Sequence, residues 1–303
     1  MGMGIGFLFM PSVSIPAQWF HRKRALAIAM VTSGAGFGGI MFSLGLNAII
    51  ENISLQWSFR ISAIIAFTLQ TIATILIRDR VKILDAKYKS FDWVLLKNRG
   101  FQFMLVWGML SMLPYVIVLF SLSPYAVAIG LTQKKGSIVT SLYSVGVIIG
   151  RPSVGLSADR FGRINLAILS AWFTGLTNFI VWLPARSMGP LCLFAFLQGF
   201  FSGYFWVLGT SVAAEVLGLQ NLGSGLSFVW LSVTPFTIPA EVIALAIVDK
   251  AKSNGKEGAD AYLGAIIFSG FLYILSGVAL CGTKWWKQKQ DGVDQAFKIL
   301  KKV

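Results

Sequence analysis

Long runs of apolar residues, separated by short polar segments, follow one another along the chain. A helix of about 20 apolar residues crosses the ~30 Å hydrocarbon core of a bilayer, and it satisfies its own backbone hydrogen bonds where water is absent. The pattern therefore predicts an all-α transmembrane protein with about nine spans. With approximate edges, the expected spans are residues 1–20, 25–50, 58–77, 100–122, 137–156, 164–184, 189–212, 222–247 and 261–282.

The composition excludes a soluble domain. Hydrophobic residues make up 56% of the 303 positions and charged residues 13%, with a mean hydropathy of +0.73, whereas soluble domains carry about 25% charged residues. The two cysteines, Cys192 and Cys281, lie in apolar runs and show no zinc-ligand spacing. The loops contain neither a nucleophile elbow nor a Walker-type phosphate loop. We therefore expect no enzymatic activity, no metal and no cofactor.

Positive charge is distributed unevenly between the two ends of the expected spans. If the turn at residues 21–24 is cytoplasmic and the spans alternate from there, 18 of the 26 Lys and Arg residues fall on the cytoplasmic side and 7 on the outer side. This asymmetry is typical of membrane proteins, and it places the N-terminus outside and the C-terminus inside. The net charge of +14 thus indicates contact with the lipid bilayer and not with nucleic acid.

The loop lengths predict two groups of spans. Residues 1–77 hold three spans, expected to be the remnant of an N-terminal bundle, and residues 100–283 hold six, expected to form a C-terminal bundle. Residues 78–99 between them are polar and basic, which is typical of a cytoplasmic linker. In the tail, residues 284–303, apolar residues recur at helical spacing among lysines. This spacing indicates an amphipathic helix on anionic lipid, with a solvated basic tail as the alternative.

One loop carries a motif that runs from Gly155 to Arg163 and reads GLSADRFGR. Gly155 allows two helices to approach closely, and Asp159 can cap the helix that follows or pair with an arginine. The pattern G-x-x-x-D-R-x-G-R resembles the loop signature of the major facilitator superfamily. The resemblance implies a conformational latch that holds one bundle against the other during alternating access. Its residues are Gly155, Asp159, Arg160, Gly162 and Arg163.

Further segments narrow the resemblance. WFHRKRALA at residues 19–27 and SGAGFGG at residues 33–39 resemble the signature of the monocarboxylate porter family, with the fungal branch as the closer match. GRPSVGL at residues 150–156 and WLSVTP at residues 230–235 fit the same family. The resemblance covers nearly the whole chain and implies a major facilitator-type helical bundle. It places residue 1 at the start of the fourth of twelve spans, so the chain is expected to be N-terminally truncated.

Arg151 is a charged residue in an otherwise apolar span, near its cytoplasmic end. Such a residue is costly unless it faces a cavity or a partner, and its planar guanidinium matches a carboxylate. In the porter family the corresponding arginine is implicated in binding the substrate carboxylate, which implies the same role here. Alternatively, Arg151 reaches the lipid headgroups or pairs with the Asp159 loop. Animal members carry an aspartate tied to proton coupling where this chain has Val147.

Two glutamates and an aromatic-rich stretch supply further candidates. Glu241 lies in the outer half of the eighth span and, if buried, is the better candidate for a proton site, whereas Glu215 is expected to anchor a loop near arginine-bearing turns. Tyr204 and Phe205 belong to an aromatic stretch of the seventh span that could stack a planar solute, although aromatic residues also fill membrane cores. The candidate substrate-binding residues are Arg151, Glu241, Tyr204 and Phe205.

These features predict a secondary transporter of a small organic solute by alternating access, with a monocarboxylate as the favoured substrate and H+ as the candidate coupling ion. A second hypothesis is transport of riboflavin or another planar solute, which fungal relatives of the family also move. A third is a truncated, transport-inactive membrane fragment. The plasma membrane is favoured over an organelle membrane, and the oligomeric state is left open.

Overall fold

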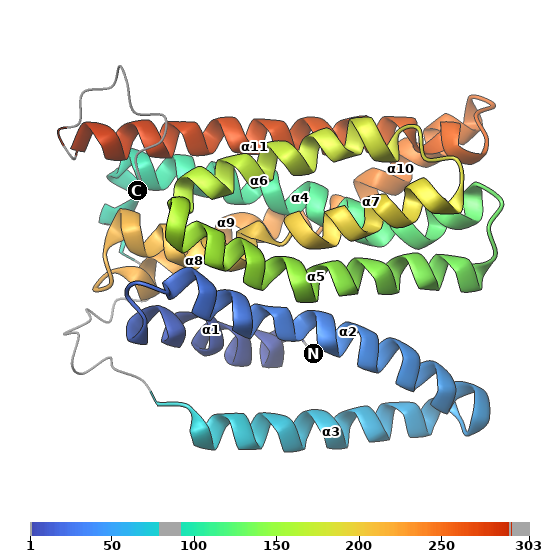
Figure 1. The fold of residues 1–303 in the computed structure, drawn as a ribbon, viewed down its shortest axis with the longest axis horizontal. Coiled ribbons are helices and arrows are strands. Elements are labelled where there is room, and N and C mark those ends of the chain that lie inside the picture. Colours follow the sequence, from blue (N-terminus) through green and yellow to red (C-terminus); the bar gives the residue numbers. More distant parts are fainter. Residues whose placement is uncertain (1, 79–91, 291, 293–303) are drawn as a thin grey trace.

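The computed structural model describes residues 2–78, 92–290 and 292. Within these residues the chain is helical and contains no β-strand, which confirms the all-α transmembrane class. The long helices, labelled in Figure 1, are α1 (Gly2–Trp19), α2 (Arg24–Asn52), α3 (Leu55–Leu76), α4 (Arg99–Ala128), α5 (Gln133–Phe161), α6 (Arg163–Thr177), α7 (Met188–Phe201), α8 (Tyr204–Leu217), α9 (Leu222–Thr237), α10 (Ala240–Ser253) and α11 (Leu263–Gln290). The short elements are η1 (Trp93–Lys97), η2 (Asn178–Trp182) and η3 (Gly258–Tyr262).

Eight stretches of the described chain are long and apolar enough to cross a membrane, and they correspond to the second through ninth expected spans. The protein is therefore an integral membrane protein. The first expected span is the 18-residue helix α1, in which Pro11, Pro16 and Gln18 lower the hydropathy. Within the expected linker, residues 92–98 form η1 and its caps, and residues 79–91 lie outside the described residues. Helix α11 continues into the expected tail as far as Gln290. The apolar positions of the expected amphipathic helix fall within residues 293–303, which lie outside the described residues.

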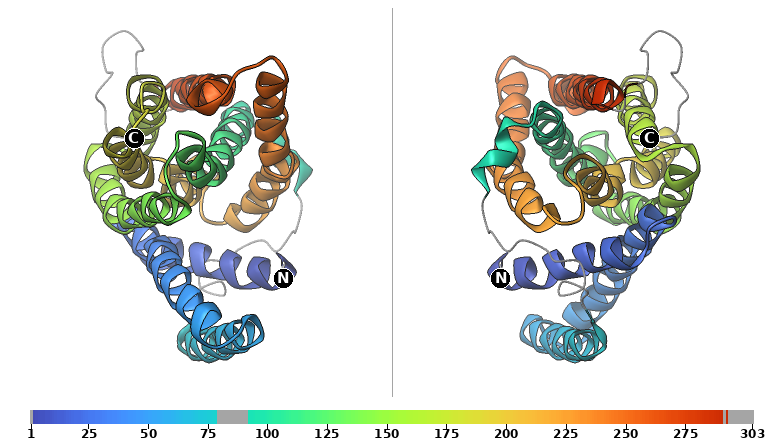
Figure 2. Two further views of the ribbon diagram at one scale, coloured as in Figure 1. Left: turned by 90° about the vertical axis from the view of Figure 1, so that its right-hand side faces the viewer. Right: turned by 90° about the vertical axis from the view of Figure 1, so that its left-hand side faces the viewer.

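The helices from α4 to α11 pack around one core, and α1, α2 and α3 lie along one side of it (Figure 2). The largest fully buried side chains of this core are aromatic: Trp107, Trp182, Tyr125, Tyr204, Tyr273, Phe101 and Phe194. Helix α2 packs along α5 and connects the first three helices to the rest. Helix α3 packs against α2 and has Ser58 as its buried residue, so most of its apolar surface is open to lipid.

Two of the expected spans are broken near their middle. The seventh consists of α7 and α8, which meet at Ser202 and Gly203, and the eighth consists of α9 and α10, which meet at Ile238 and Pro239. Proline has no N–H to donate and clashes with the preceding helical turn, which explains the second break. The first break lies beside Arg151 and is described with the site.

Small residues allow α2 and α5 to cross closely. A Cβ atom on Gly155 would lie 2.8 Å from the Ala25 carbonyl oxygen, and one on Gly36 would lie 2.9 Å from that of Ser144. Beyond this crossing α2 bends away from α5, as Figure 1 shows, and Met41 is 57% exposed. The two helices therefore meet closely at the end of the bundle that holds the turns at residues 20–23 and 161–163. We call this the basic end, and the other the opposite end.

Candidate functional site

Arg151 lies deeper in its helix than the sequence predicts. Helix α5 continues to Phe161, whereas the expected span ended at residue 156. Arg151 precedes Phe161 by ten residues, which corresponds to about 15 Å along a helix axis, close to half the thickness of a bilayer core. Its side chain is 4% exposed, so it does not reach out to the lipid headgroups.

The Arg151 guanidinium points across the boundary between α5 and α2. Its Nη1 donates a hydrogen bond to the backbone carbonyl of Thr32, which is itself buried. Its Nε has no hydrogen-bond partner among the described residues, and none of the acidic side chains described pairs with it. The alternative pairing with the Asp159 loop is therefore not seen. A buried cation with one carbonyl acceptor is an incompletely satisfied group.

The break between α7 and α8 makes room for this arginine. Gly203 lies against the side chain, and a Cβ atom there would be 2.8 Å from Arg151 Nε and 3.3 Å from its Cγ. Next to it, the Ser202 hydroxyl lies 3.2 Å from the hydroxyl of Tyr143, two turns before Arg151 in α5. The Tyr143–Ser202 hydroxyl pair and the contact of Gly203 with Arg151 thus join α5 to the break between α7 and α8.

The structure places Tyr204 and Phe205 inside the core of the bundle. They are 1% and 3% exposed. The Tyr204 ring stacks on Trp107, and its hydroxyl lies 3.1 Å from that of Ser276 in α11. Phe205 packs edge-on against Trp107, with ring centroids 5.1 Å apart. Both side chains therefore contact α4 and neighbouring core helices in this arrangement.

The next residue, Trp206, lies instead where α8 meets α1. Its ring is 5.3 Å from that of Phe9 in α1 and 5.3 Å from that of Trp230 in α9, measured between centroids. Its indole Nε1 is buried and has no hydrogen-bond partner among the described residues. Sequence reasoning missed Trp206 as a separate candidate. No sequence signal separated it from Tyr204 and Phe205, because all three belong to one aromatic run.

Asp159 caps a helix, but not the helix that follows it. Its carboxylate accepts hydrogen bonds from the backbone N–H groups of Ala25 and Leu26, at 3.2 and 3.0 Å, in the first turn of α2. These donors have no partner inside their own helix, and the partial positive charge of a helix start favours an anion. Of the two roles predicted for Asp159, the structure shows the pairing with an arginine, Arg163. Asp159 caps α2 and not the following helix, because the close crossing of α2 and α5 brings the start of α2 to it.

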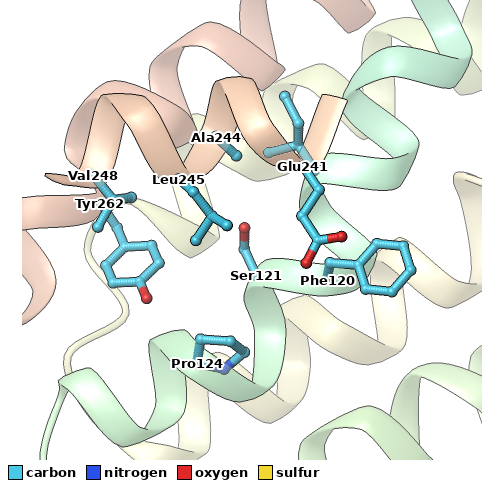
Figure 3. A pocket seen from close by; sticks show the side chains of 9 residues that line it. Phe120, Ser121, Pro124, Glu241, Ala244, Leu245, Val248 and Tyr262 are labelled. Atoms are coloured by element: carbon cyan, nitrogen blue, oxygen red, sulfur yellow. The ribbon is translucent and has the colours of Figure 1, made fainter. Parts of the chain in front are cut away.

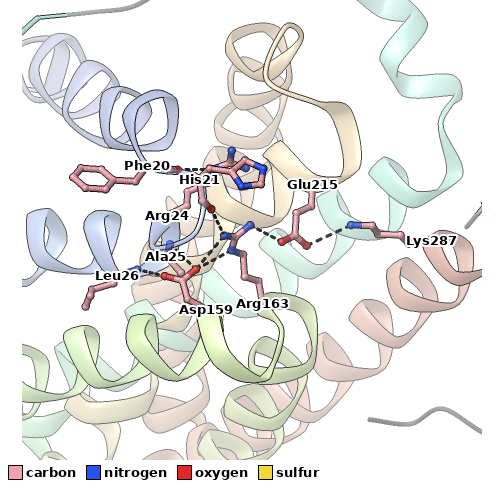
Figure 4. A network of polar contacts seen from close by, with 9 residues as sticks. All are labelled: Phe20, His21, Arg24, Ala25, Leu26, Asp159, Arg163, Glu215 and Lys287. Carbon is pink, nitrogen blue, oxygen red and sulfur yellow. Dashed lines mark hydrogen bonds and ion pairs between the residues drawn. The ribbon is translucent and has the colours of Figure 1, made fainter. Parts of the chain in front are cut away.

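Arg163 connects this cap to two further helices (Figure 4). Its Nη2 lies 3.0 Å from Asp159 Oδ1 and donates to the backbone carbonyl of His21 at 3.1 Å, while its Nη1 lies 2.6 Å from Glu215 Oε1 at the end of α8. Lys287 of α11 lies 3.5 Å from the second oxygen of Glu215. Glu215 thus anchors an arginine-bearing turn, as the sequence predicts.

The other residues of the expected latch have distinct positions. Gly162 adopts φ = 96° between α5 and α6, a left-handed conformation that glycine tolerates best. Gly155 is the contact point with α2 described above. Arg160 is exposed, and no described acidic side chain pairs with it. The network therefore links α2, α5, α6, α8 and α11 at the basic end, mainly through Asp159 and Arg163.

Glu241 lies apart from these groups. It is exposed, in the first turn of α10, and lines a pocket against α4 (Figure 3). A proton site at Glu241 was expected only if its carboxyl is buried, and in this arrangement it is exposed.

Comparison with known proteins adds to this picture. No protein-family model matches the chain. It is 34% identical over 288 residues to "Probable transporter MCH2" of Saccharomyces cerevisiae, which covers 93% of this chain and 59% of that protein. It is 31% identical over 291 residues to "MFS transporter asaE" of Aspergillus flavus, covering 91% and 61% of the two chains. The chain is similar to fungal transporters of the major facilitator superfamily.

A third relative, "Agnestins efflux protein AgnL12" of Paecilomyces divaricatus, is 26% identical over 278 residues, covering 91% of this chain and 62% of that protein. The chain thus spans about three fifths of the length of these relatives. Their names support the superfamily that the loop motif indicates, and none of the three specifies a monocarboxylate.

Proposed function

We propose that the protein takes part in secondary transport of a small organic anion, with a carboxylate bound at Arg151. The observation that carries the proposal is the burial of this guanidinium inside a membrane-spanning helix, with the Thr32 carbonyl as its one acceptor among the described residues. A carboxylate supplies the two acceptor oxygens that match the planar fork of arginine. The similarity to fungal transporters supports transport as the activity.

The position of this arginine supports alternating access as the proposed mechanism. Arg151 belongs to α5 and bonds to α2, so a bound anion competes with the Thr32 carbonyl for the same N–H groups. Binding would then weaken a contact between the two helices. The Asp159 network would hold α2 and α5 together at the basic end until its own hydrogen bonds and ion pairs break. Arg151 and Asp159 thus form two separate contacts between α5 and α2, one after the other along the helices.

Flat solutes are the second candidate substrate class, favoured by Trp206. This ring lies with Phe9 and Trp230 where α1, α8 and α9 meet. Aromatic rings in such pairs are stabilised by about 0.5–1.5 kcal/mol beyond the apolar area that they bury. A planar solute would replace Phe9 against the two indoles. We therefore propose Trp206, in place of Tyr204 and Phe205, as the aromatic residue nearest the substrate.

The remaining parts of the proposal are a monocarboxylate as substrate, proton coupling and a location in the plasma membrane. With valine at position 147, coupling through an aspartate at that position is not available. Glu241 would be the proton site in this scheme, once a conformational change buries it.

The test is uptake and efflux of labelled monocarboxylates and riboflavin by cells that express the chain. We expect carboxylate transport, and we expect Arg151→Lys to be made at normal levels but to lose most of it, because an ammonium lacks the planar fork. Arg60→Lys, an exposed position in α3, is the matched control and should transport normally.

Near-normal carboxylate transport by Arg151→Lys would show that this residue is not the anion site. Riboflavin transport that is insensitive to Arg151→Lys but lost in Trp206→Leu would favour the planar-solute hypothesis. Absence of transport for every solute would favour the third hypothesis, a transport-inactive fragment.

A further inference from the structure

A second site of different chemistry lies between α4 and α10. This pocket is a groove, open on one side, with a cavity volume of about 40 Å³, well below the range for enclosed small-molecule sites, so a ligand would lie only partly inside it. Helix α4 lines it from Ile117 to Pro124 and helix α10 from Glu241 to Val248, each with residues spaced i, i+3, i+4 and i+7, and Tyr262 closes one end. This spacing presents one face of each helix to the pocket.

The charge in this pocket is negative and its walls are apolar. Glu241 is the charged residue that lines it, and no described residue forms a salt bridge or hydrogen bond with its carboxylate. Glu241 follows the break at Pro239, in the first turn of α10, where the helix dipole favours an anion. Figure 3 shows the carboxylate beside the ring of Phe120, with the Ser121 hydroxyl farther along the pocket and Tyr262 at the far end.

We propose that this pocket binds an organic ammonium ion with a small apolar body. The ammonium group would contact the Glu241 carboxylate, and the Phe120 ring beside it can add a cation–π attraction. The body would lie along the apolar faces toward Tyr262. The seven residues from Glu241 to Val248 correspond to about 10 Å along the helix axis, enough for one ring and a short linker.

The site is separate from Arg151. In α4, Gly108 lies at the level of Phe205, because a Cβ atom on Gly108 would be 3.1 Å from that ring. Phe120 comes twelve residues later, about 18 Å farther along the helix. Arg151 attracts an anion and Glu241 a cation, so the two sites select different molecules. The ammonium site shares Glu241 with the proposed proton coupling, but it does not require anion transport at Arg151.

The test is the thermal unfolding of the full chain in nanodiscs of zwitterionic lipid. A ligand that binds the folded state raises Tm as its concentration exceeds Kd. We expect 2-phenylethylammonium to raise Tm, whereas 2-phenylethanol and 3-phenylpropionate, of similar size, should not. Glu241→Gln should weaken binding about tenfold or more, since hydrogen bonds to a charged group are the strong ones. Asp249→Asn, an exposed position in α10 outside the pocket, is the control and should bind normally.

A second variant separates loss of the site from loss of folding. Leu245 is 51% exposed and lines the pocket, so Leu245→Trp should fill it without disturbing the core, leaving the ligand-free Tm unchanged and abolishing the shift. Equal shifts for the ammonium and the alcohol, or an unchanged shift in Glu241→Gln or Leu245→Trp, would overturn the proposal. Arg151→Gln should retain the shift, and a loss there would overturn the assignment to this pocket.

Discussion

At the scale of single residues, the central feature is a buried guanidinium whose hydrogen-bonding capacity is only partly used. Arg151 donates to Thr32, and its Nε lies against Gly203 without a described partner. Removing an arginine from water is costly unless an anion or several acceptors replace the solvent. In the proposed function a substrate carboxylate would supply them, so that binding and the contact between α2 and α5 would be coupled at one side chain.

Asp159 is the second residue with an effect beyond its own helix. Asp159→Ala removes the acceptor of two α2 N–H groups, and we expect a loss of about 0.5–2 kcal/mol in the free energy of unfolding, the range for a helix cap. Hydrogen exchange should accelerate at Ala25 and Leu26. Transport should fall further than the amount of folded protein, because the residue buries little area and mainly holds two helices in place.

Asp92→Ala is the matched control for this variant. Asp92 accepts from the Val94 N–H within η1 and caps only that short element. Its loss should accelerate exchange near residues 93–97 and leave transport unchanged. Unchanged exchange at Ala25 and Leu26 in Asp159→Ala would contradict the cap that the structure shows.

The sequence identifies some of these residues and not others, for a physical reason. Arg151 and Asp159 stand out because a charge in or beside an apolar span is rare. Thr32 could not be found, since its contribution is a backbone carbonyl and depends on which helix lies beside α5. Trp206 was not separated from Tyr204 and Phe205, because a one-residue step turns a side chain by about 100° around the helix, from the core to a boundary between helices.

At the scale of elements, the break between α7 and α8 shapes the site. Gly203→Ala should displace the Arg151 side chain, because the added Cβ would lie 2.8 Å from its Nε. Stability should change by less than about 1 kcal/mol, since alanine is the better helix former and an arginine side chain can shift. Carboxylate uptake should nevertheless fall several-fold.

Gly189→Ala in α7 is the control for that substitution. No atom lies within 4 Å of a Cβ atom built there, so uptake should be normal and stability equal or slightly higher. Full uptake by Gly203→Ala would show that the position of the guanidinium is not critical. Uptake and Tm measured on the same preparations distinguish the two effects.

Apolar length predicts the spans well but not their interruptions. The hydrophobic pattern placed the starts of the described spans within four residues and their ends within eight, because a bilayer fixes the approximate length of an apolar helix. It gave no sign of the break at Gly203, where α7 and α8 are both apolar. The hydropathy pattern also predicted that the Arg151 span ends at residue 156, because the polar residues of the latch lower the hydropathy beyond it. The helix itself continues to Phe161.

At the scale of the whole molecule, the two ends differ in charge. The turns that the lysine and arginine count placed in the cytoplasm, such as those at residues 20–23 and 161–163, lie at the basic end (Figure 1). Within the described chain, the expected outer turns, such as those at residues 129–132 and 254–257, lie at the opposite end. The alternation of the spans is thus compatible with the predicted orientation.

Cysteine labelling tests this orientation in intact cells. With Cys192 and Cys281 replaced by serine, Lys97→Cys should be labelled only after permeabilisation, and Lys256→Cys should react with an impermeant reagent from outside. Both lysines are exposed, so access through the protein does not limit the reaction. Labelling of Lys97→Cys from outside would reverse the orientation.

The contact between Asp159 and the start of α2 also constrains the order in which the chain is completed. The two partners are 133 and 134 residues apart, and at about 5–20 residues per second a ribosome needs about 7–27 s to make that length. During this interval the first turn of α2 lacks its acceptor. The first turn of newly made α2 therefore lacks this cap until α5 is made and supplies the carboxylate.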